Sequence, residues 1–154
     1  ELWEAGALGT IERYDREAGK WQLLPSMHSP GCCTTMVLGA TCRMAFSLGG
    51  LSLSGQTLGV TKRLSLGALL LGGSVEATEE GEPLHWSCLP HMPTPRHQVS
   101  AAAFGGGVVA VGGKGAKFEC TGDVEFFDPE ACAWEALPGL SSPRLRAAVI
   151  SGRL

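Results

Sequence analysis

Short runs of apolar and small residues, each ended by glycine, recur along this chain of 154 residues. Residues 32–38 and 99–104 form two such runs, and each is followed by a second run, at 44–48 and 108–111, that closes on paired glycines. Apolar runs of this length bounded by glycine are typical of β-strands rather than of helices. The pattern therefore predicts many short strands joined by turns.

A tryptophan motif marks three copies of a larger unit. Trp21, Trp86 and Trp134 are each followed by Leu-Pro at the third and fourth positions, and a second proline stands five positions further on. A β-branched residue followed by glutamate precedes each tryptophan, at 11–12, 75–76 and 124–125, which predicts a strand before the one that carries the tryptophan. No single copy of such a unit buries its own apolar face, so stability belongs to the stacked array.

The copies differ in length, because Trp86 to Trp134 spans 48 positions and Trp21 to Trp86 spans 65. Most of the excess lies between the paired glycines at 49–50 and the strand predicted at 75–76. An enlarged loop is therefore predicted, an insert at about 51–73.

This insert is richer in leucine than a solvated loop should be. A hairpin, a docking surface and an irregular segment all stay open for it. A rival alignment takes Gly72 and Gly73 as the paired glycines, but only Ser74 would then separate them from the next strand. The alignment on Gly49 and Gly50 is preferred for that reason.

These marks resemble kelch repeats, which build the blades of β-propellers. The resemblance rests on paired glycines, an aromatic–Asp pair and the tryptophan, found here at Gly49, Gly50, Gly112, Gly113, Tyr14, Asp15, Phe127, Asp128, Trp21, Trp86 and Trp134. The middle copy lacks the aromatic–Asp pair. The resemblance implies an all-β fold of kelch-type propeller blades, each a four-stranded antiparallel sheet.

In blade terms the chain, 1–154, is expected to be a partial kelch-repeat domain with about three blades' worth of sequence. The predicted division gives 1–25 to two strands of one blade, 26–90 to a second blade with the insert, 91–138 to a third and 139–154 to the start of a fourth. Propellers close with about 4–8 blades, so an incomplete or open propeller is expected. Blades cut at both ends predict a fragment of a longer protein whose open sheet edges favour self-association.

Composition narrows the classes of partner. The net charge of −3, with 12 scattered Lys and Arg, provides no basic field for a phosphate backbone, so no nucleic acid is expected. The most apolar run, 67–73, is far shorter than the ~20 residues that span a bilayer, and no signal peptide opens the chain. No membrane partner and a cytoplasmic location are therefore predicted. The six cysteines would permit a disulfide framework, but without a secretory signal free thiols are favoured.

A catalytic role has to be considered, because the kelch propellers that the chain resembles include a copper oxidase. A copper-radical site of that kind needs tyrosine ligands with histidines, and the single tyrosine, Tyr14, already serves the repeat signature. The four histidines lack metal-ligand spacing, and Cys-x-x-Cys does not occur. The glycine-rich stretches 105–107 and 112–115 match neither phosphate-binding pattern. No catalytic, metal or cofactor-binding residue is predicted, so the chain is expected not to be an enzyme and to need no cofactor.

Two arginines stand at the same place in the repeat. Arg96 and Arg144 each follow the proline before a new innermost strand, and the first copy has Gly31 there. The resemblance implies that binding residues come from the face around the propeller axis where these segments lie. We therefore predict that Arg96, His97 and Arg144 contact an acidic peptide motif on a partner protein. The alternative is a structural salt bridge between blades.

The leading functional prediction is a non-catalytic protein–protein interaction module of a kelch-repeat protein. By resemblance, it would be the substrate-recognition part of a BTB-kelch adaptor for a cullin-RING ubiquitin ligase. A kelch scaffold or cytoskeleton-binding protein without a ligase role is the first alternative. A truncated isoform with no independent function is the second.

Overall fold

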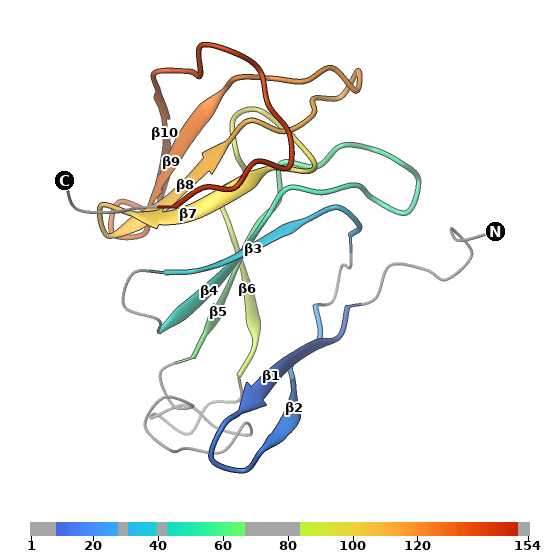
Figure 1. Cartoon of the computed structure of the whole chain (residues 1–154), viewed down its shortest axis with the longest axis vertical. Coiled ribbons are helices and arrows are strands. Elements are labelled where there is room, and N and C mark those ends of the chain that lie inside the picture. The colour runs from blue at the N-terminus through green and yellow to red at the C-terminus, as the bar shows by residue number, and fades with distance from the viewer. Residues whose placement is uncertain (1–8, 28–30, 40–42, 67–83, 151–154) are drawn as a thin grey trace.

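The computed structural model describes residues 9–27, 31–39, 43–66 and 84–150, and these form three antiparallel sheets and no helix (Figure 1). The all-β fold of propeller-like, four-stranded sheets is therefore confirmed, and the sheets do not close into a ring. In chain order the strands are β1 Ile11–Asp15, β2 Lys20–Leu24, β3 Thr35–Leu38, β4 Met44–Leu48, β5 Thr61–Ser65, β6 Trp86–Leu89, β7 Ser100–Phe104, β8 Gly107–Val111, β9 Val124–Asp128 and β10 Ala133–Leu137.

The sheets follow one another along the molecule, with β1–β2 at one end, β3–β6 in the middle and β7–β10 at the other end (Figure 1). In the two larger sheets each strand pairs with its neighbours in the chain, in the orders β3-β4-β5-β6 and β7-β8-β9-β10. The two larger sheets contact each other through their first strands, β3 and β7. In the two larger sheets the first strand therefore lies on the inner side of the array, and the last strand, which carries the tryptophan, lies at the opposite edge of the sheet.

Apolar side chains fill the two spaces between consecutive sheets. One cluster joins the first sheet to the second and contains Leu24, Met27, Ala45, Leu64, Leu66, Leu84 and Trp86. The other joins the second sheet to the third and contains Phe46, Leu48, Met92, Val99, Val108, Ala110 and Phe127. Each sheet completes its core only against a neighbour, as the repeated pattern predicts.

The tryptophans fasten one sheet to the next. Trp86 donates its Nε1–H to the carbonyl oxygen of Pro25, and Trp134 does the same to Pro90, each at 2.9 Å. Each acceptor is the proline of the preceding Trp-x-x-Leu-Pro motif. Trp21 instead packs at a tilt against Tyr14, and it is 65% exposed because no described sheet covers that face of β1–β2.

The paired glycines fasten the sheets through the backbone. Gly49 and Gly112 have φ near +60°, and a Cβ on either would lie 2.1 or 2.3 Å from the carbonyl oxygen of Arg96 or Arg144. The glycine that follows each of them donates its N–H to that same carbonyl. Glycine is needed at these positions because the chain is left-handed there and the next repeat approaches too closely for a side chain.

The aspartates of the signature close the outer hairpins. Asp15 Oδ1 accepts the N–H groups of Glu17 and Ala18, both at 3.0 Å, and Asp128 Oδ1 accepts those of Glu130 and Ala131. These bonds to the backbone, that to Ala18 first, hold the pKa of Asp15 below its usual value. The aromatic–Asp pair is therefore a turn-forming element.

The structure corrects the prediction of the third strand in the middle copy. That strand is β5, which pairs with β4 on one side and β6 on the other, and it lies inside the range predicted as an insert, 51–73. The leucines that looked too apolar for a loop are core residues, since Leu64 is fully buried opposite Trp86 and Leu66 joins the same cluster. The strand was missed because Lys62 stands where the other copies have glutamate.

The extra length of the middle copy lies between β5 and β6, where the third sheet has only the short turn 129–132 between β9 and β10. The strand predicted at 75–76 and the pair Gly72–Gly73 lie outside the described residues. Each sheet falls within one of the ranges 1–25, 26–90 and 91–138. The assignment of those ranges as blades of one propeller stays a prediction.

Candidate functional site

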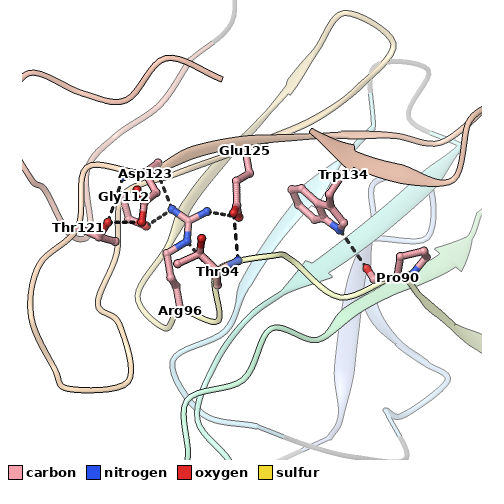
Figure 2. Close-up of polar contacts among 8 residues, drawn as sticks. All are labelled: Pro90, Thr94, Arg96, Gly112, Thr121, Asp123, Glu125 and Trp134. Atoms are coloured by element: carbon pink, nitrogen blue, oxygen red, sulfur yellow. Dashed lines mark hydrogen bonds and ion pairs between the residues drawn. The ribbon is translucent and has the colours of Figure 1, made fainter. Parts of the chain in front are cut away.

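Arg96 lies in the interior of the third sheet and is completely buried (Figure 2). Its Nη2 donates to Glu125 Oε2 at 2.7 Å, and its Nη1 donates to the carbonyl oxygens of Gly112 and Asp123 at 2.8 and 2.7 Å. The other oxygen of Glu125 accepts the backbone N–H of Thr94 at 3.0 Å. The expectation that Arg96 contacts a partner is wrong, because its buried guanidinium already binds groups of its own repeat. Through these bonds Arg96 links the β8–β9 connection to the segment before β7.

His97 is buried as well, with 1% of its surface exposed. Its ring packs edge-on against Phe118, and its Nδ1 lies 3.4 Å from the hydroxyl oxygen of Thr57. Burial, with a smaller contribution from the Lys114 ammonium, lowers the pKa of His97. The partner contact predicted for His97 is therefore also wrong: the neutral ring fills the junction between the second and third sheets.

Arg144 has the backbone position of Arg96 and an exposed side chain. Its carbonyl accepts the N–H of Gly113 at 2.7 Å, as that of Arg96 accepts Gly50, and its own N–H donates to Thr121, as that of Arg96 donates to Leu58. The described residues contain no further sheet whose glutamate could pair with it. The predicted partner contact of Arg144 stays a prediction.

The residues two positions after Gly31, Arg96 and Arg144 share an unusual backbone conformation. Cys33, Gln98 and Arg146 have φ of 57°, 54° and 50°, the left-handed conformation that non-glycine residues seldom adopt. The Gln98 N–H donates to the carbonyl of Cys33 at 3.0 Å, and the Arg146 N–H donates to that of Gln98 at 3.2 Å. The three residues thus form a hydrogen-bonded series across successive repeats, just before β3, just before β7 and at the corresponding place after the third sheet.

These residues line an open cavity of about 400 Å³. Its wall comes from the starts of three successive innermost segments and consists of Cys33, Thr34, Thr35, Gln98, Val99, Ser100, Ala101, Arg146 and Ala147. Arg146 supplies the single charge of that lining, and no carboxylate contributes to it. Strained backbone conformations concentrate at binding sites, which makes this cavity the candidate functional site.

Two hydroxyl groups of the cavity wall hold the wall itself together. Thr34 Oγ1 lies 2.9 Å from Ser47 Oγ and donates to the carbonyl of Leu48, and Thr35 Oγ1 donates to the carbonyl of Val99. The bond from Thr35 joins β3 to the segment entering β7. The polar side chains of the lining that these bonds do not use are therefore those of Cys33, Gln98, Ser100 and Arg146, on a wall fixed by the threonines.

The predicted contact residues lie two positions away from this cavity. The prediction named the arginine after each proline, whereas the residue two positions later lines the cavity, and that residue is Cys33, Gln98 or Arg146 in the three copies. The shared feature is a backbone conformation, not a residue type. Only the alignment of copies by position, applied to residues that differ, would have found it.

Within the described ranges no group of three His, Cys, Asp or Glu side chains could hold a metal ion. Nor does that part of the chain contain a helix long and apolar enough to cross a membrane. The five described cysteines, Cys32, Cys33, Cys88, Cys120 and Cys132, are free thiols.

Comparison with known proteins gives one sequence relative and a shared fold. A stretch of 59 residues is 36% identical to an F-box/kelch-repeat protein of Arabidopsis thaliana, and it covers 38% of this chain and 16% of that protein. The solved structure of YjhT superposes on 92% of the chain with a TM-score of 0.70 at 12% identity, and the chain covers 42% of YjhT. No family model matches. The chain is thus similar to a kelch-repeat protein and spans less than half the length of the proteins it matches.

Proposed function

We propose that the chain is a non-catalytic protein-interaction module that holds a partner over the cavity lined by Cys33, Gln98 and Arg146. The observation that carries this proposal is the repetition of one left-handed, at least partly exposed backbone position in three consecutive repeats around a single cavity. Repeat arrays commonly bind through such a surface because each unit presents one residue at the same height. The likeness to a kelch-repeat protein supports an interaction role in general.

The partner proposed for this surface is a protein segment with an acidic residue. Arg146 is exposed and is the cavity's one charged group, so an acidic side chain meets no opposing carboxylate on the cavity wall. A guanidinium binds a carboxylate through two parallel hydrogen bonds, which gives direction as well as charge. The amide of Gln98 lies on the same wall and offers a neutral donor and acceptor beside the guanidinium.

Arg146 is proposed as the contact in place of Arg96 and His97, because those two residues are buried. Arg144 is retained as a second candidate because its side chain is exposed. The backbone of Arg144 matches that of Arg96, which favours a structural role for it. Variants of the two exposed arginines separate these roles.

The test uses peptides selected from a random display library on the 154-residue chain, with binding measured by fluorescence anisotropy. Selected peptides should be enriched in Asp and Glu, and Arg146→Glu should weaken their binding at least about tenfold, because it sets a like charge against the ligand. Arg16→Glu is the matched control, since Arg16 is an exposed arginine in the turn between β1 and β2. Its affinity should match that of the parent chain.

Equal binding by Arg146→Glu and Arg16→Glu, with unchanged circular dichroism, would contradict the proposed contact. If Arg144→Glu loses binding and Arg146→Glu does not, the contact lies two positions closer to the proline and the sequence-based prediction was right. Selected peptides without acidic residues would overturn the proposed partner class but not the interaction role.

The role of the whole protein is a further proposal. Substrate recognition for a BTB-kelch ubiquitin ligase adaptor and a scaffold or cytoskeletal role both use a binding propeller. The sequence that flanks these 154 residues in their reading frame discriminates them, because a BTB domain would mark the adaptor. Turnover assays and metal analysis of the purified chain test the non-catalytic assignment.

A further inference from the structure

Two adjacent cysteines stand where the second sheet meets the cavity. Cys32 and Cys33 are both partly exposed free thiols, and Cys33 lines the cavity wall together with Arg146. The backbone of Cys32 is held on both sides, because its N–H donates to the carbonyl of Leu51 at 3.1 Å and its own carbonyl accepts the Leu51 N–H at 2.8 Å. The pair is therefore fixed at the cavity by the structure.

The two thiols have different surroundings. The Sγ of Cys32 lies 3.9 Å from the carbonyl oxygen of Leu51, an acceptor that only a protonated thiol can serve. Burial, with a further contribution from Cys33, raises the pKa of Cys32. Cys32 is thus less readily ionised than an ordinary thiol, and Cys33 is the cysteine that lines the cavity.

The charge of the cavity selects among reagents. Arg146 supplies a positive charge on the wall that Cys33 shares, and the lining holds no carboxylate to repel an anion. A small disulfide that carries carboxylates, such as oxidised glutathione, is therefore attracted to the place where Cys33 reacts. The cavity of about 400 Å³ has room for part of such a molecule.

We propose that Cys33 is a modification site for small anionic disulfides and that Cys32 removes the resulting adduct. In the first step the Cys33 thiolate attacks one sulfur of the small disulfide, a new S–S bond forms to Cys33, and the other half leaves as a thiolate. In the second step Cys32 gives up its proton and attacks Cys33 Sγ, and the remaining half leaves as a thiolate. Two protein thiols lose two electrons and two protons, and one small disulfide becomes two thiols.

The product of the second step is strained and easily reversed. Adjacent Cα atoms are about 3.8 Å apart across a trans peptide, whereas disulfide-linked Cα atoms are usually about 4.4–6.8 Å apart. A disulfide between neighbours is therefore more readily reduced than an ordinary structural one. Oxidation of the pair would therefore be a reversible modification at the cavity. This chemistry requires only the thiols and not the partner proposed above.

The experiment treats the 154-residue chain with oxidised glutathione, quenches with acid, and maps each cysteine by peptide mass spectrometry. Cys33, counted as its glutathione adduct together with its disulfide to Cys32, should react faster than the more exposed Cys88, Cys120 and Cys132. With neutral hydroxyethyl disulfide, the rate at Cys33 relative to the exposed cysteines should be about fivefold lower, because that is the factor expected for one contact between charges in water. Cys32→Ser should accumulate the adduct on Cys33, because the second step is removed.

The variant Arg146→Gln should reduce the rate at Cys33 with oxidised glutathione and leave the rate with hydroxyethyl disulfide unchanged. The two reagents on the unaltered chain already decide the proposal if a variant fails to fold. Reaction at Cys33 no faster than at the exposed cysteines with both reagents would overturn the modification site. An adduct on Cys33 that is equally abundant with and without Cys32 would overturn its removal by Cys32.

Discussion

In the sheet β7–β10, Arg96 enters from the segment before the innermost strand and pairs with Glu125, whereas in β3–β6 the corresponding positions are Gly31 and Lys62. The correspondence is fixed by pairing, because Cys32 bridges to Leu51 as His97 bridges to Lys114. It is fixed again on the third strand, where Leu64 faces Trp86 as Phe127 faces Trp134. Both members of the pair differ between the sheets.

The two differences belong together. A glutamate at position 62 would be a buried carboxylate with no arginine from position 31, and burial of an unpaired charge is costly. The second sheet instead has a lysine there, 7% exposed, and burial lowers the pKa of that ammonium. The two sheets therefore share one backbone frame, while the charged pair in the interior is exchanged as a unit.

The largest expected effect comes from breaking the pair in the third sheet. Glu125→Leu leaves the buried guanidinium of Arg96 without its carboxylate and should lower the free energy of unfolding by about 3–5 kcal/mol. Urea unfolding at neutral pH measures it. Glu135→Leu on the exposed side of β10 is the control and should change stability by less than about 0.5 kcal/mol.

The double variant Arg96→Met with Glu125→Leu sharpens the same comparison. Removing both charges should recover much of the loss, because a buried pair replaced by apolar residues is often close to neutral. If the double variant is as unstable as Glu125→Leu alone, the arginine supports the sheet through Gly112 and Asp123 rather than through the carboxylate.

A second prediction concerns the frame that the two sheets share. Gly49→Ala places a Cβ against the carbonyl of Arg96 in a left-handed conformation and should cost about 2–3 kcal/mol. Gly55→Ala is the matched control, since Gly55 also has positive φ but no atom within 4 Å of the added Cβ, and should cost only about 1–2 kcal/mol. Thermal and urea unfolding compare them. Equal losses would mean that the contact between repeats contributes nothing beyond local backbone strain.

A third prediction tests the tryptophans as links between sheets. Trp86→Phe removes the hydrogen bond to Pro25 and leaves that carbonyl without the indole, so it should cost about 1–2 kcal/mol. Trp21→Phe serves as the control, because Trp21 is mostly exposed, and the loss there should stay below about 0.5 kcal/mol. A larger loss at Trp21 than at Trp86 in urea unfolding would contradict the linking role.

The smallest effect is expected at Lys62. Its lowered pKa means that folding disfavours the ammonium form, so the penalty is present at neutral pH and disappears as pH rises through the ordinary value of 10.5. Lys62→Met should therefore stabilise the chain slightly at pH 7, by no more than about 1.5 kcal/mol, and less at pH 10. Lys20→Met at an exposed position of β2 should show no such trend. A gain that grows with pH would contradict the buried-cation interpretation.

Much of the fold follows from residues that the repeat fixes. The glycine pairs, the Asp turns and the tryptophans could be predicted because each answers a local or neighbour requirement that recurs in at least two copies. The third strand of the middle copy could not, because Lys62 replaces the glutamate that marked it elsewhere. Its leucines carried the missed signal, since residues as apolar as Leu64 and Leu66 belong in a core.

The candidate site was harder to predict than the fold. Arg96 and Arg144 share one sequence signal and one backbone position, yet the first is buried against Glu125 and the second is exposed. Sequence alone does not say which arginine finds a carboxylate from its own sheet. The residues that do line the cavity, Cys33, Gln98 and Arg146, have no common chemistry for a motif to display.

By itself, the sequence determined the repeat, the strand-rich class and the residues that join one repeat to the next, because these depend on spacing, apolar pattern and backbone freedom. Tertiary structure alone decided which cations are buried, where the third strand of the middle sheet lies, and which side chains meet at the cavity. Burial and pairing arise only when segments distant in the chain pack together, and for a charged side chain that packing determines whether it stabilises the interior or remains available to a partner.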